Sequence, residues 1–382
     1  MRNALIFSHL PAYGYVGQVI CVKRKLRRAA ALLLAAVMTV PLYGAAGESA
    51  PPTVSAKCAA LLNADTGELL YGKNEHERAS MASTTKIMTS LLALERGRPD
   101  EVVTASEQAV RVEGTSIGLR AGDQITLKTL VCGMLLESGN DAANVTAEYL
   151  AGSSEAFAVM MNQRAAEIGM ADTHFVTPSG LDDEEHYSTA YDMALLGACA
   201  IQNRIFVQIC SAQSLRVSYG TPEAARTFTN HNRMLTAYEG AIGIKTGFTK
   251  KSGRCLVSAA RRNGVTLVAV TLNDPDDWKD HAALLDYGFE QVQTVPADCD
   301  FSSIAVPVVG GAESSAAIYS PEELFLPAGQ EVQRFVFIEK FLYAPVQKDD
   351  IIGEAIYVQN GSIVGRVALC AAADIPVRAQ GP

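Results

Sequence analysis

The sequence predicts an α+β domain followed by a small all-β domain. Residues 57–72 carry the signal of a β-hairpin, and three short apolar runs typical of strands follow within 241–272. Between these regions the apolar residues recur at helical spacing, whereas after about residue 295 only strand-like runs are found. The chain has 382 residues, 48% hydrophobic and 19% charged, so it has room for two domains and is not mainly disordered.

The first domain is predicted over residues 57–293. Its hairpin turns at Asp65-Thr66-Gly67, and Asn263-Gly264 marks a second tight turn between two strands, so the sheet is at least partly antiparallel. We expect helices inserted between the sheet strands, with an all-helical middle. The expected helices cover 82–96, 126–137, 142–151, 155–169, 189–203 and 279–293, and the later strands cover 241–247, 254–260 and 265–272.

The second domain, predicted over residues 300–375, is expected to contain strands alone. Turn residues such as Gly310-Gly311 and Asn360-Gly361 separate its apolar runs, which show no helical period. The segment 47–56 is small, polar and proline-bearing, so it is predicted to be a linker. The expected strands of the second domain cover 303–309, 315–319, 333–339, 354–359 and 363–370.

Residues 1–46 are predicted to be a signal peptide with an N-terminal extension. A basic cluster at 23–28 precedes an apolar run at 29–43 and then small residues, which is the order of a secretory signal. As a helix the run would be about 23 Å long, short of the roughly 30 Å hydrocarbon core, and an uncleaved anchor is the alternative. Residues 1–22 are unusual before such a signal, so one hypothesis places the translation start near Val22. The mature chain is expected outside the cytoplasm.

Charge and cysteine usage exclude several classes of function. The formal charge is −9, and the first 46 residues hold six basic residues and no acid, so the remainder carries −15. Because phosphate contacts need clustered Lys and Arg, nucleic acid is not an expected partner. The eight cysteines are scattered without a CxxC pair, which indicates neither a disulfide framework nor a zinc site. We interpret them as small buried hydrophobic residues.

Ser83-Thr84-Thr85-Lys86 places a hydroxyl and an amine one helical turn apart on the same face. At a helix start the serine N–H is free to help hold an oxyanion. A neutral lysine can take the serine proton if burial or a second cation lowers the pKa of its amine. Taken alone, the motif is a weak signal, and a capping serine with a surface lysine explains it better.

Two further motifs follow at the positions this chemistry requires. Ser138-Gly139-Asn140 follows a buried helix, where a second serine can relay a proton and an amide can orient a lysine or substrate. Lys245-Thr246-Gly247 ends a strand, where Lys245 and Thr246 can bind a carboxylate and Gly247 permits close approach of an extended peptide. Each is weak alone, but the three together in this order predict a serine acyl-transfer site.

With these motifs the sequence resembles low-molecular-mass penicillin-binding proteins, which are serine-type D-alanyl-D-alanine carboxypeptidases, over about residues 55–375. Other matching stretches are Pro178–Leu181, Tyr187–Asp192 and Leu285–Phe289. The resemblance implies a β-lactamase/transpeptidase-like domain, an antiparallel sheet with helices on both sides and a helical insert, followed by a small β domain. It also implies removal of the terminal D-alanine from peptidoglycan pentapeptide stems through an acyl-enzyme.

The resemblance assigns a role to each motif residue and implies no metal or organic cofactor. β-Lactam antibiotics would acylate the same serine as the substrate does. His174 and His186 form no HExxH motif and are expected to have a structural or solvent role. The implied roles are nucleophile for Ser83, general base for Lys86, proton relay for Ser138, orientation for Asn140, charge for Lys245, carboxylate binding for Thr246, close substrate approach for Gly247, and an oxyanion hole from the N–H groups of Ser83 and Phe248.

The sequence departs from the family pattern in two places. No C-terminal amphipathic helix is expected, because Pro376 and Gly381 break the final segment, so association with a membrane surface is left open. Ser179 stands where many relatives carry histidine or asparagine. Three alternatives stay open: a DD-endopeptidase that cuts cross-links, a serine β-lactamase, and an inactive cell-wall scaffold.

Overall fold

The computed structural model describes residues 50–379 except 293, 328–331 and 360. Two compact units divide after residue 293, and each is described by itself. The signal peptide expected over 1–46 lies outside the described residues. Within the described part of the chain no single helix is long and apolar enough to cross a membrane. One bent pair of helices, Ala190–Ala200 and Arg204–Cys210 at 109°, meets the length and composition test when joined.

The first unit is organised around a five-stranded antiparallel sheet in the order β2-β1-β9-β8-β7. The expected hairpins are both confirmed: β1 pairs with β2, and β8 turns into β9 through Asn263 and Gly264, which have φ of 48° and 77°. Positive φ at both positions is what a two-residue hairpin loop demands. The strands are β1 Cys58–Asn63, β2 Leu69–Lys73, β7 Ala241–Thr249, β8 Gly253–Arg262 and β9 Val265–Leu272.

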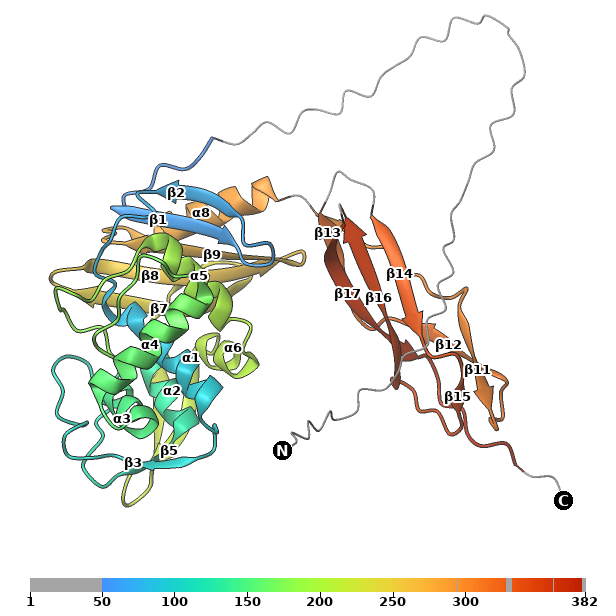
Figure 1. The fold of residues 1–382 in the computed structure, drawn as a ribbon, viewed down its shortest axis with the longest axis horizontal. Helices are drawn as coiled ribbons and strands as arrows, with labels where there is room; N and C mark the ends of the chain where they lie inside the picture. The colour runs from blue at the N-terminus through green and yellow to red at the C-terminus, as the bar shows by residue number, and fades with distance from the viewer. Residues whose placement is uncertain (1–49, 293, 328–331, 360, 380–382) are drawn as a thin grey trace, which may run out of the picture. The chain divides into compact units, whose positions relative to one another are not determined.

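Helices cover both faces of this sheet, as Figure 1 shows. Helix α8 lies on one face over a small core that includes Leu61 and Leu267, and Met234 of the short α7 joins this core. Helices α1 to α6 enclose the larger core on the opposite face. The predicted fold class is confirmed. The helices are η1 Ala82–Thr85, α1 Lys86–Arg96, α2 Leu127–Leu136, α3 Asn140–Ala151, α4 Ser154–Ile168, α5 Ala190–Ala200, α6 Arg204–Cys210, α7 Met234–Ala237 and α8 Asp277–Gln291.

The expectation of an all-helical middle is wrong, because two small hairpins lie among the helices. Strands β3 Val102–Thr104 and β4 Gln124–Thr126 pair with each other, as do β5 Ser214–Tyr219 and β6 Ala224–Thr229. Both hairpins are largely exposed, so their apolar alternation is weak. The phenol of Tyr219 nevertheless reaches inward and donates a hydrogen bond of 2.5 Å to the Ile117 carbonyl.

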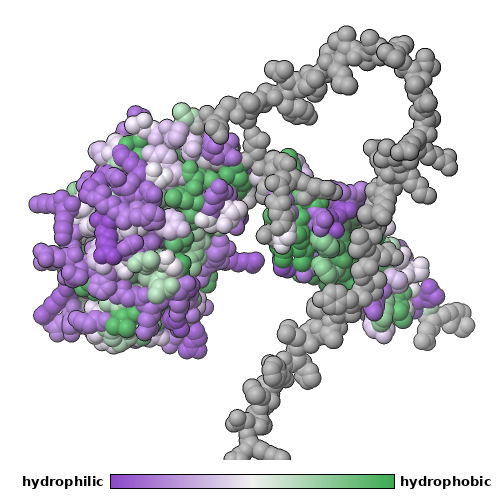
Figure 2. All heavy atoms as spheres, turned by 45° about the horizontal axis from the view of Figure 1, so that its top comes forward, coloured by the Kyte–Doolittle hydropathy of each residue, from purple (hydrophilic) through white to green (hydrophobic). Residues whose placement is uncertain are grey.

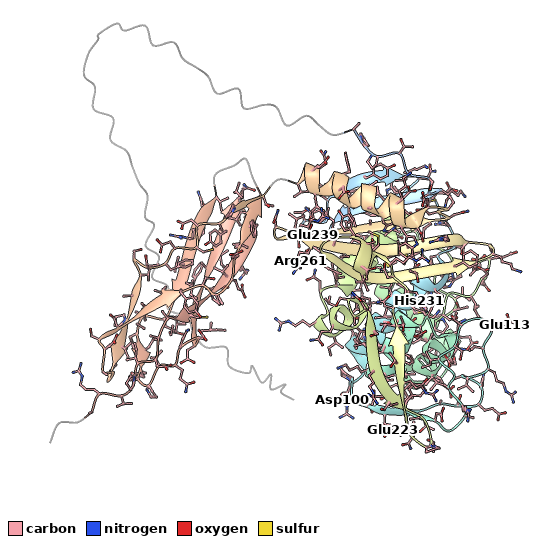
Figure 3. All side chains as sticks on the ribbon, turned by 180° about the vertical axis from the view of Figure 1, so that it is seen from behind. Asp100, Glu113, Glu223, His231, Glu239 and Arg261 are labelled. Atoms are coloured by element: carbon pink, nitrogen blue, oxygen red, sulfur yellow. The ribbon has the colours of Figure 1, made fainter. Side chains whose placement is uncertain are left out.

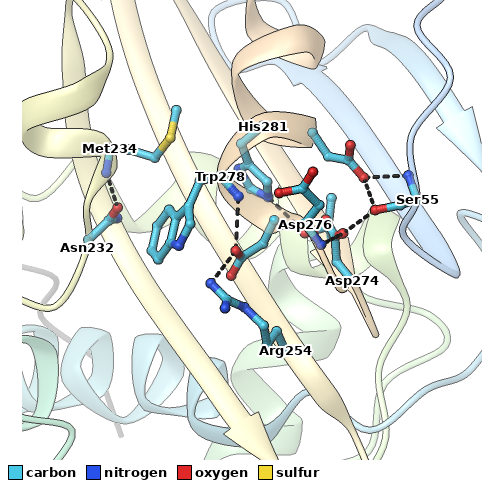
Figure 4. A network of polar contacts seen from close by, with 11 residues as sticks. Ser55, Asn232, Met234, Arg254, Asp274, Asp276, Trp278 and His281 are labelled. Carbon is cyan, nitrogen blue, oxygen red and sulfur yellow. Dashed lines mark hydrogen bonds and ion pairs between the residues drawn. The ribbon is translucent and has the colours of Figure 1, made fainter.

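Polar contacts, some of them fully buried, fix α8 against one face of the sheet (Figure 4). The imidazole of His281, which is fully buried, bonds to the hydroxyl groups of Ser258 and Thr271 at 2.5 and 3.0 Å. The Ser55 hydroxyl contacts Asp274 and Asp280 at 2.9 and 2.8 Å. These contacts hold both α8 and the segment before β1 in place behind the strands that carry the site.

The second unit is all-β. Its six-stranded sheet has the order β14-β16-β17-β12-β11-β15, and a separate pair is formed by β10 and β13. Figure 2 shows apolar side chains on its visible face, and its exposed apolar residues include Phe335, Phe337 and Tyr343. The strands are β10 Thr294–Pro296, β11 Ala305–Val309, β12 Ser315–Tyr319, β13 Phe325–Pro327, β14 Gln333–Ile338, β15 Leu342–Tyr343, β16 Ile351–Gln359 and β17 Ser362–Ala371.

Candidate active site

Buried residues on both sides of the Ser83 turn hold its backbone in place. Ser83 lies in the short η1 helix, which continues directly into α1, and the flanking Met81 and Ile87 are fully buried in the main core. The Thr84 hydroxyl donates a hydrogen bond of 2.6 Å to the Met81 carbonyl. Ala82 adopts φ of 48°, a strained conformation for a residue with a Cβ. The surrounding core therefore fixes the turn and leaves the partly exposed Ser83 at its surface.

The amine of Lys86 is completely buried and points at the Ser83 hydroxyl. It donates hydrogen bonds to Ser83 Oγ at 3.0 Å, to Asn140 Oδ1 at 2.7 Å and to the Ser179 carbonyl at 2.7 Å. Burial lowers the pKa of Lys86 well below its usual value, and the positive charge of Lys245 lowers it further, while Asp141 opposes the shift. The condition that the sequence set for a neutral lysine beside the serine is thus present in the structure.

The loop between α2 and α3 brings Asn140 to this lysine. Besides contacting Lys86, the Asn140 amide donates to the Glu113 carbonyl at 2.6 Å, and Glu113 itself lies in a loop at the periphery of the unit (Figure 3). The carboxylate of Asp141 accepts from the N–H groups of Ile117 and Leu119, both at 3.0 Å. The loop before β4 is therefore clamped onto the start of α3.

Ser138 lies in the same loop, with φ of 61°. Its carbonyl accepts a hydrogen bond of 2.7 Å from the Thr115 hydroxyl. Its side chain is partly exposed, and among the described contacts no hydrogen bond joins its hydroxyl to Lys86 or Lys245. The structure thus places Ser138 two residues from the lysine's partner Asn140 without a direct bond to either amine.

Strand β7 is an edge of the sheet and lies against the Ser83 turn. Lys245 is almost fully buried, burial lowers its pKa to about 7, and its amine donates to the Thr246 carbonyl at 2.9 Å. A Cβ added at Gly247 would lie 3.1 Å from the backbone nitrogen of Ser83, which shows how closely the strand approaches. Thr246 is partly exposed and Phe248 is 65% exposed at this edge.

A bulge in β7 sets the direction of the strand before Lys245. The register with β8 shifts between Ala241 and Gly243, and Ile244 adopts φ of 110°, which is a genuine outlier for a β-branched residue. Gly243 also has positive φ, and a Cβ there would lie 2.3 Å from the Cys210 carbonyl at the end of α6. Close packing of α6 against the bulge therefore determines where Lys245 enters the site.

The loop at 176–181 supplies acceptors that the sequence did not reveal. The Ser179 carbonyl accepts from Lys86, and the Pro178 carbonyl accepts from the Thr89 hydroxyl at 2.6 Å. Gly180 has φ of 82°, and a Cβ there would meet the Ala82 carbonyl at 1.9 Å. Ser179 contacts Lys86 through its backbone carbonyl, so its residue type does not reveal the contact. Only the glycine at position 180 could have indicated from the sequence that this loop passes close to the serine turn.

The arrangement can support covalent acyl transfer. It combines a partly exposed hydroxyl, a buried amine of lowered pKa in contact with it, a second buried amine and an edge strand. Within the described ranges, no group of three or more His, Cys, Asp or Glu side chains could hold a metal ion. The seven cysteines in the described part of the chain are all free, and five of them are buried.

The family profile described as D-alanyl-D-alanine carboxypeptidase matches residues 45–276. The chain belongs to this family. It is 31% identical to D-alanyl-D-alanine carboxypeptidase DacF of Bacillus subtilis over 84% of this chain and 86% of that protein. It is 30% identical to DacC of Escherichia coli over 82% of both chains. The structure of penicillin-binding protein 5 from Haemophilus influenzae matches with a TM-score of 0.60 and 28% identity, covering 86% of this chain and 99% of that one.

Membership confirms the main functional prediction. The chain is a serine hydrolase of the D-alanyl-D-alanine carboxypeptidase family, and this activity is favoured over the alternatives of endopeptidase, β-lactamase and inactive scaffold. The assignment rests on relatives whose alignments span most of both chains.

Proposed function

We propose that the chain removes the terminal D-alanine from peptidoglycan pentapeptide stems, with Ser83 as nucleophile and Lys86 as general base. The observation that carries this proposal is the contact of 3.0 Å between the buried Lys86 amine and the Ser83 hydroxyl. Because burial lowers its pKa, the Lys86 amine is neutral more often than an exposed lysine, so it can more readily accept a proton.

In the acylation step Ser83 Oγ attacks the carbonyl carbon of the penultimate D-alanine while its proton passes to Lys86. The N–H groups of Ser83 and Phe248 hold the negative oxygen of the tetrahedral intermediate. Its collapse breaks the peptide C–N bond, and the departing D-alanine nitrogen receives the proton from Lys86 through Ser138. Contacts of this kind commonly form only when substrate is bound, so an unbonded Ser138 hydroxyl is compatible with the relay. Water then hydrolyses the ester, which frees Ser83.

The stem peptide is bound as an added strand along the free edge of β7. Main-chain groups of an edge strand are available to an extended peptide. The absence of a side chain at Gly247 lets β7 itself, and with it a peptide bound along its edge, lie close to the serine turn. Lys245 supplies positive charge for the terminal carboxylate, and Thr246 hydrogen-bonds to it. Asn140 keeps the Lys86 amine directed at Ser83.

β-Lactam antibiotics acylate Ser83 by the same route and act as covalent inhibitors. Their strained amide carbonyl occupies the place of the D-alanyl carbonyl. The enzyme works outside the cytoplasmic membrane, where its substrate is found, after export by the signal expected over residues 1–46. The domain over 57–293 performs the reaction, and the β domain over 300–375 spaces it from the membrane or meets a partner.

Mass spectrometry of a pentapeptide substrate and of the penicillin-treated protein tests the proposal. We expect loss of one D-alanine from the peptide and a stable adduct on Ser83. Ser83→Ala abolishes both, and Lys86→Ala loses acylation while the fold survives. Ser90→Ala is the matched control, because Ser90 lies two turns further along and its buried hydroxyl has no hydrogen-bond partner. An adduct that persists on another residue in Ser83→Ala contradicts the assignment.

The same assay separates the alternative activities. Cross-linked muropeptides and monomeric pentapeptides are offered side by side, and faster cleavage of the cross-links would favour an endopeptidase. Rapid release of hydrolysed penicillin in place of a long-lived adduct would favour a β-lactamase. Failure to bind a fluorescent penicillin would favour a scaffold.

A further inference from the structure

One buried imidazole outside the three motifs joins both segments that hold Lys86. His186 lies in the loop before α5 and is only 3% exposed. Its Nε2 lies 2.8 Å from the hydroxyl of Thr85, the residue directly before Lys86 in the turn. Its Nδ1 lies 2.9 Å from the backbone nitrogen of Val176, at the start of the 176–181 loop.

These contacts fix the tautomer of the ring. The Val176 N–H can only donate, so Nδ1 is the unprotonated acceptor, and Nε2 carries the hydrogen that is donated to Thr85. A second donor, the Thr177 N–H, also faces Nδ1 at 3.3 Å. Burial lowers the pKa of His186 to about 4, so the ring is neutral near pH 7.

The two segments joined by the ring are those that direct the Lys86 amine. On one side Thr85 precedes Lys86 in the turn. On the other, the 176–181 loop presents the Ser179 carbonyl to the amine at 2.7 Å, and its Gly180 fits directly against the Ala82 backbone. A displacement of either segment would change the distance from Lys86 Nζ to Ser83 Oγ.

We propose that His186 is a positioning residue, which staples the Ser83 turn to the loop that orients Lys86. Among the described hydrogen bonds, none joins the ring to Ser83 or to β7, so the proposal gives it no proton to transfer in the reaction. Its loss leaves the substrate-binding edge intact and misaligns the base. Because about 1 Å of misplacement can cost on the order of a hundredfold in rate, a smaller displacement gives a measurable loss in kcat with KM unchanged.

Two substitutions separate the two hydrogen bonds of the ring. In His186→Asn the side-chain oxygen can still accept from Val176, but the shorter side chain does not reach Thr85. In His186→Gln the longer amide can still donate to Thr85. We expect His186→Asn to lower kcat and the rate of Ser83 acylation by about 10-fold, with KM unchanged, and His186→Gln to retain most of the rate.

Thr85→Val tests the same bond from the other side, because it removes the hydroxyl with little change in volume. We expect its kcat to match that of His186→Asn, and the double variant to be no slower than either single variant, because the two remove one interaction. His174→Gln is the control in the same loop, and it should keep the wild-type kcat. Thermal unfolding of each variant gives the folded fraction.

Three results would overturn the proposal: a wild-type kcat in His186→Asn, a loss that follows the folded fraction alone, or losses that multiply in the double variant. If His186→Asn does not fold, Thr85→Val decides, and a wild-type kcat there has the same meaning. The inference rests on the proposed roles of Ser83 and Lys86. If penicillin labels a residue other than Ser83 in the wild-type protein, those roles are refuted. If penicillin labels Ser83 normally but substitution of His186 leaves kcat unchanged, only the positioning role of His186 is refuted.

Discussion

The side-chain oxygen of Asn140 accepts a hydrogen bond of 2.7 Å from the Lys86 amine, although the two residues are 54 positions apart in the chain. The acceptor is a neutral amide, so it orients the amine without adding a negative charge beside it. The contact with Asn140 therefore leaves the pKa of Lys86 lowered. A carboxylate in the same place would raise this pKa.

Asn140→Asp is expected to disable the base. It keeps an acceptor for the Lys86 amine but loses the amide hydrogen bond to the Glu113 carbonyl. A carboxylate at this distance favours the charged lysine and raises the pKa of Lys86, so acylation by penicillin falls at pH 7 and recovers as the pH rises. The measurement is the acylation rate as a function of pH. Asn203→Asp is the control, since aspartate caps α6 as well as asparagine does. An acid limb that stays in place would contradict the role of Lys86.

The dependence of kcat/KM on pH should be bell-shaped. Rates rise as Lys86 loses its proton, and they fall as Lys245, whose pKa burial lowers to about 7, loses the charge that binds the substrate carboxylate. Bound carboxylate favours the charged amine, so the alkaline limb of kcat should lie at higher pH than that of kcat/KM. Lys245→Ala should lower kcat/KM and remove this limb. A limb that first falls near the ordinary lysine value of 10.5 would exclude Lys245 as its source.

Gly247→Ala should reduce activity more than stability. The added Cβ would lie 3.1 Å from the backbone atoms of Ser83 and Thr84, so the turn must shift, and we expect kcat/KM to fall by about 10- to 100-fold. Gly288→Ala in α8 is the counterpart, because its Cβ would meet side chains of the core at 2.6 Å and costs about 1–3 kcal/mol of stability. Steady-state kinetics and urea unfolding distinguish the two, and equal kinetic losses in both would contradict the close approach of β7.

Acid should destabilise the protein partly through His281. Burial lowers its pKa from 6.5 to about 3, so between these values the unfolded chain binds the extra proton. The stability contribution is complete above pH 6.5 and is lost as the pH falls, at about 1.4 kcal/mol per pH unit. Urea unfolding of wild type and of His281→Gln, which keeps hydrogen-bonding groups but does not titrate, isolates this slope. Identical pH dependence of the two proteins would refute it.

The fold was predictable where periodicity and turn chemistry agree. Helix α1 and the Asn263-Gly264 hairpin were both expected, because one buries an apolar face and the other has a turn that few sequences fit. Helix α6 and the β5–β6 hairpin were not, since a seven-residue helix gives too short a period and an exposed hairpin needs little apolar alternation. Tertiary contacts, such as that of Tyr219 with Ile117, stabilise them.

The motifs indicated residues that lie close together, but not what surrounds them. Lys86 donates to Ser83 and Asn140, and Gly247 lies close to the Ser83 backbone, whereas the Ser138 hydroxyl makes no described bond to either amine. The acceptors at Ser179 and Pro178 are backbone carbonyl oxygens. Every residue has such an oxygen, so the residue types at these positions could not predict the contacts. His186 was expected to have a structural or solvent role. Only the three-dimensional structure shows that one ring nitrogen contacts Thr85 in the serine turn and the other contacts Val176 in the 176–181 loop.

The unpaired edge of β7 is both the proposed peptide-binding site and a site at which aggregation can start. Most proteins blunt such an edge, because it templates pairing with another chain and so invites aggregation. Here Phe248 is exposed beside it, and under the proposed mode of binding any protection of the edge would also shut out the stem peptide. Occupants of this edge, whether peptides or antibiotics, should therefore keep the enzyme dispersed at concentrations where the empty protein self-associates.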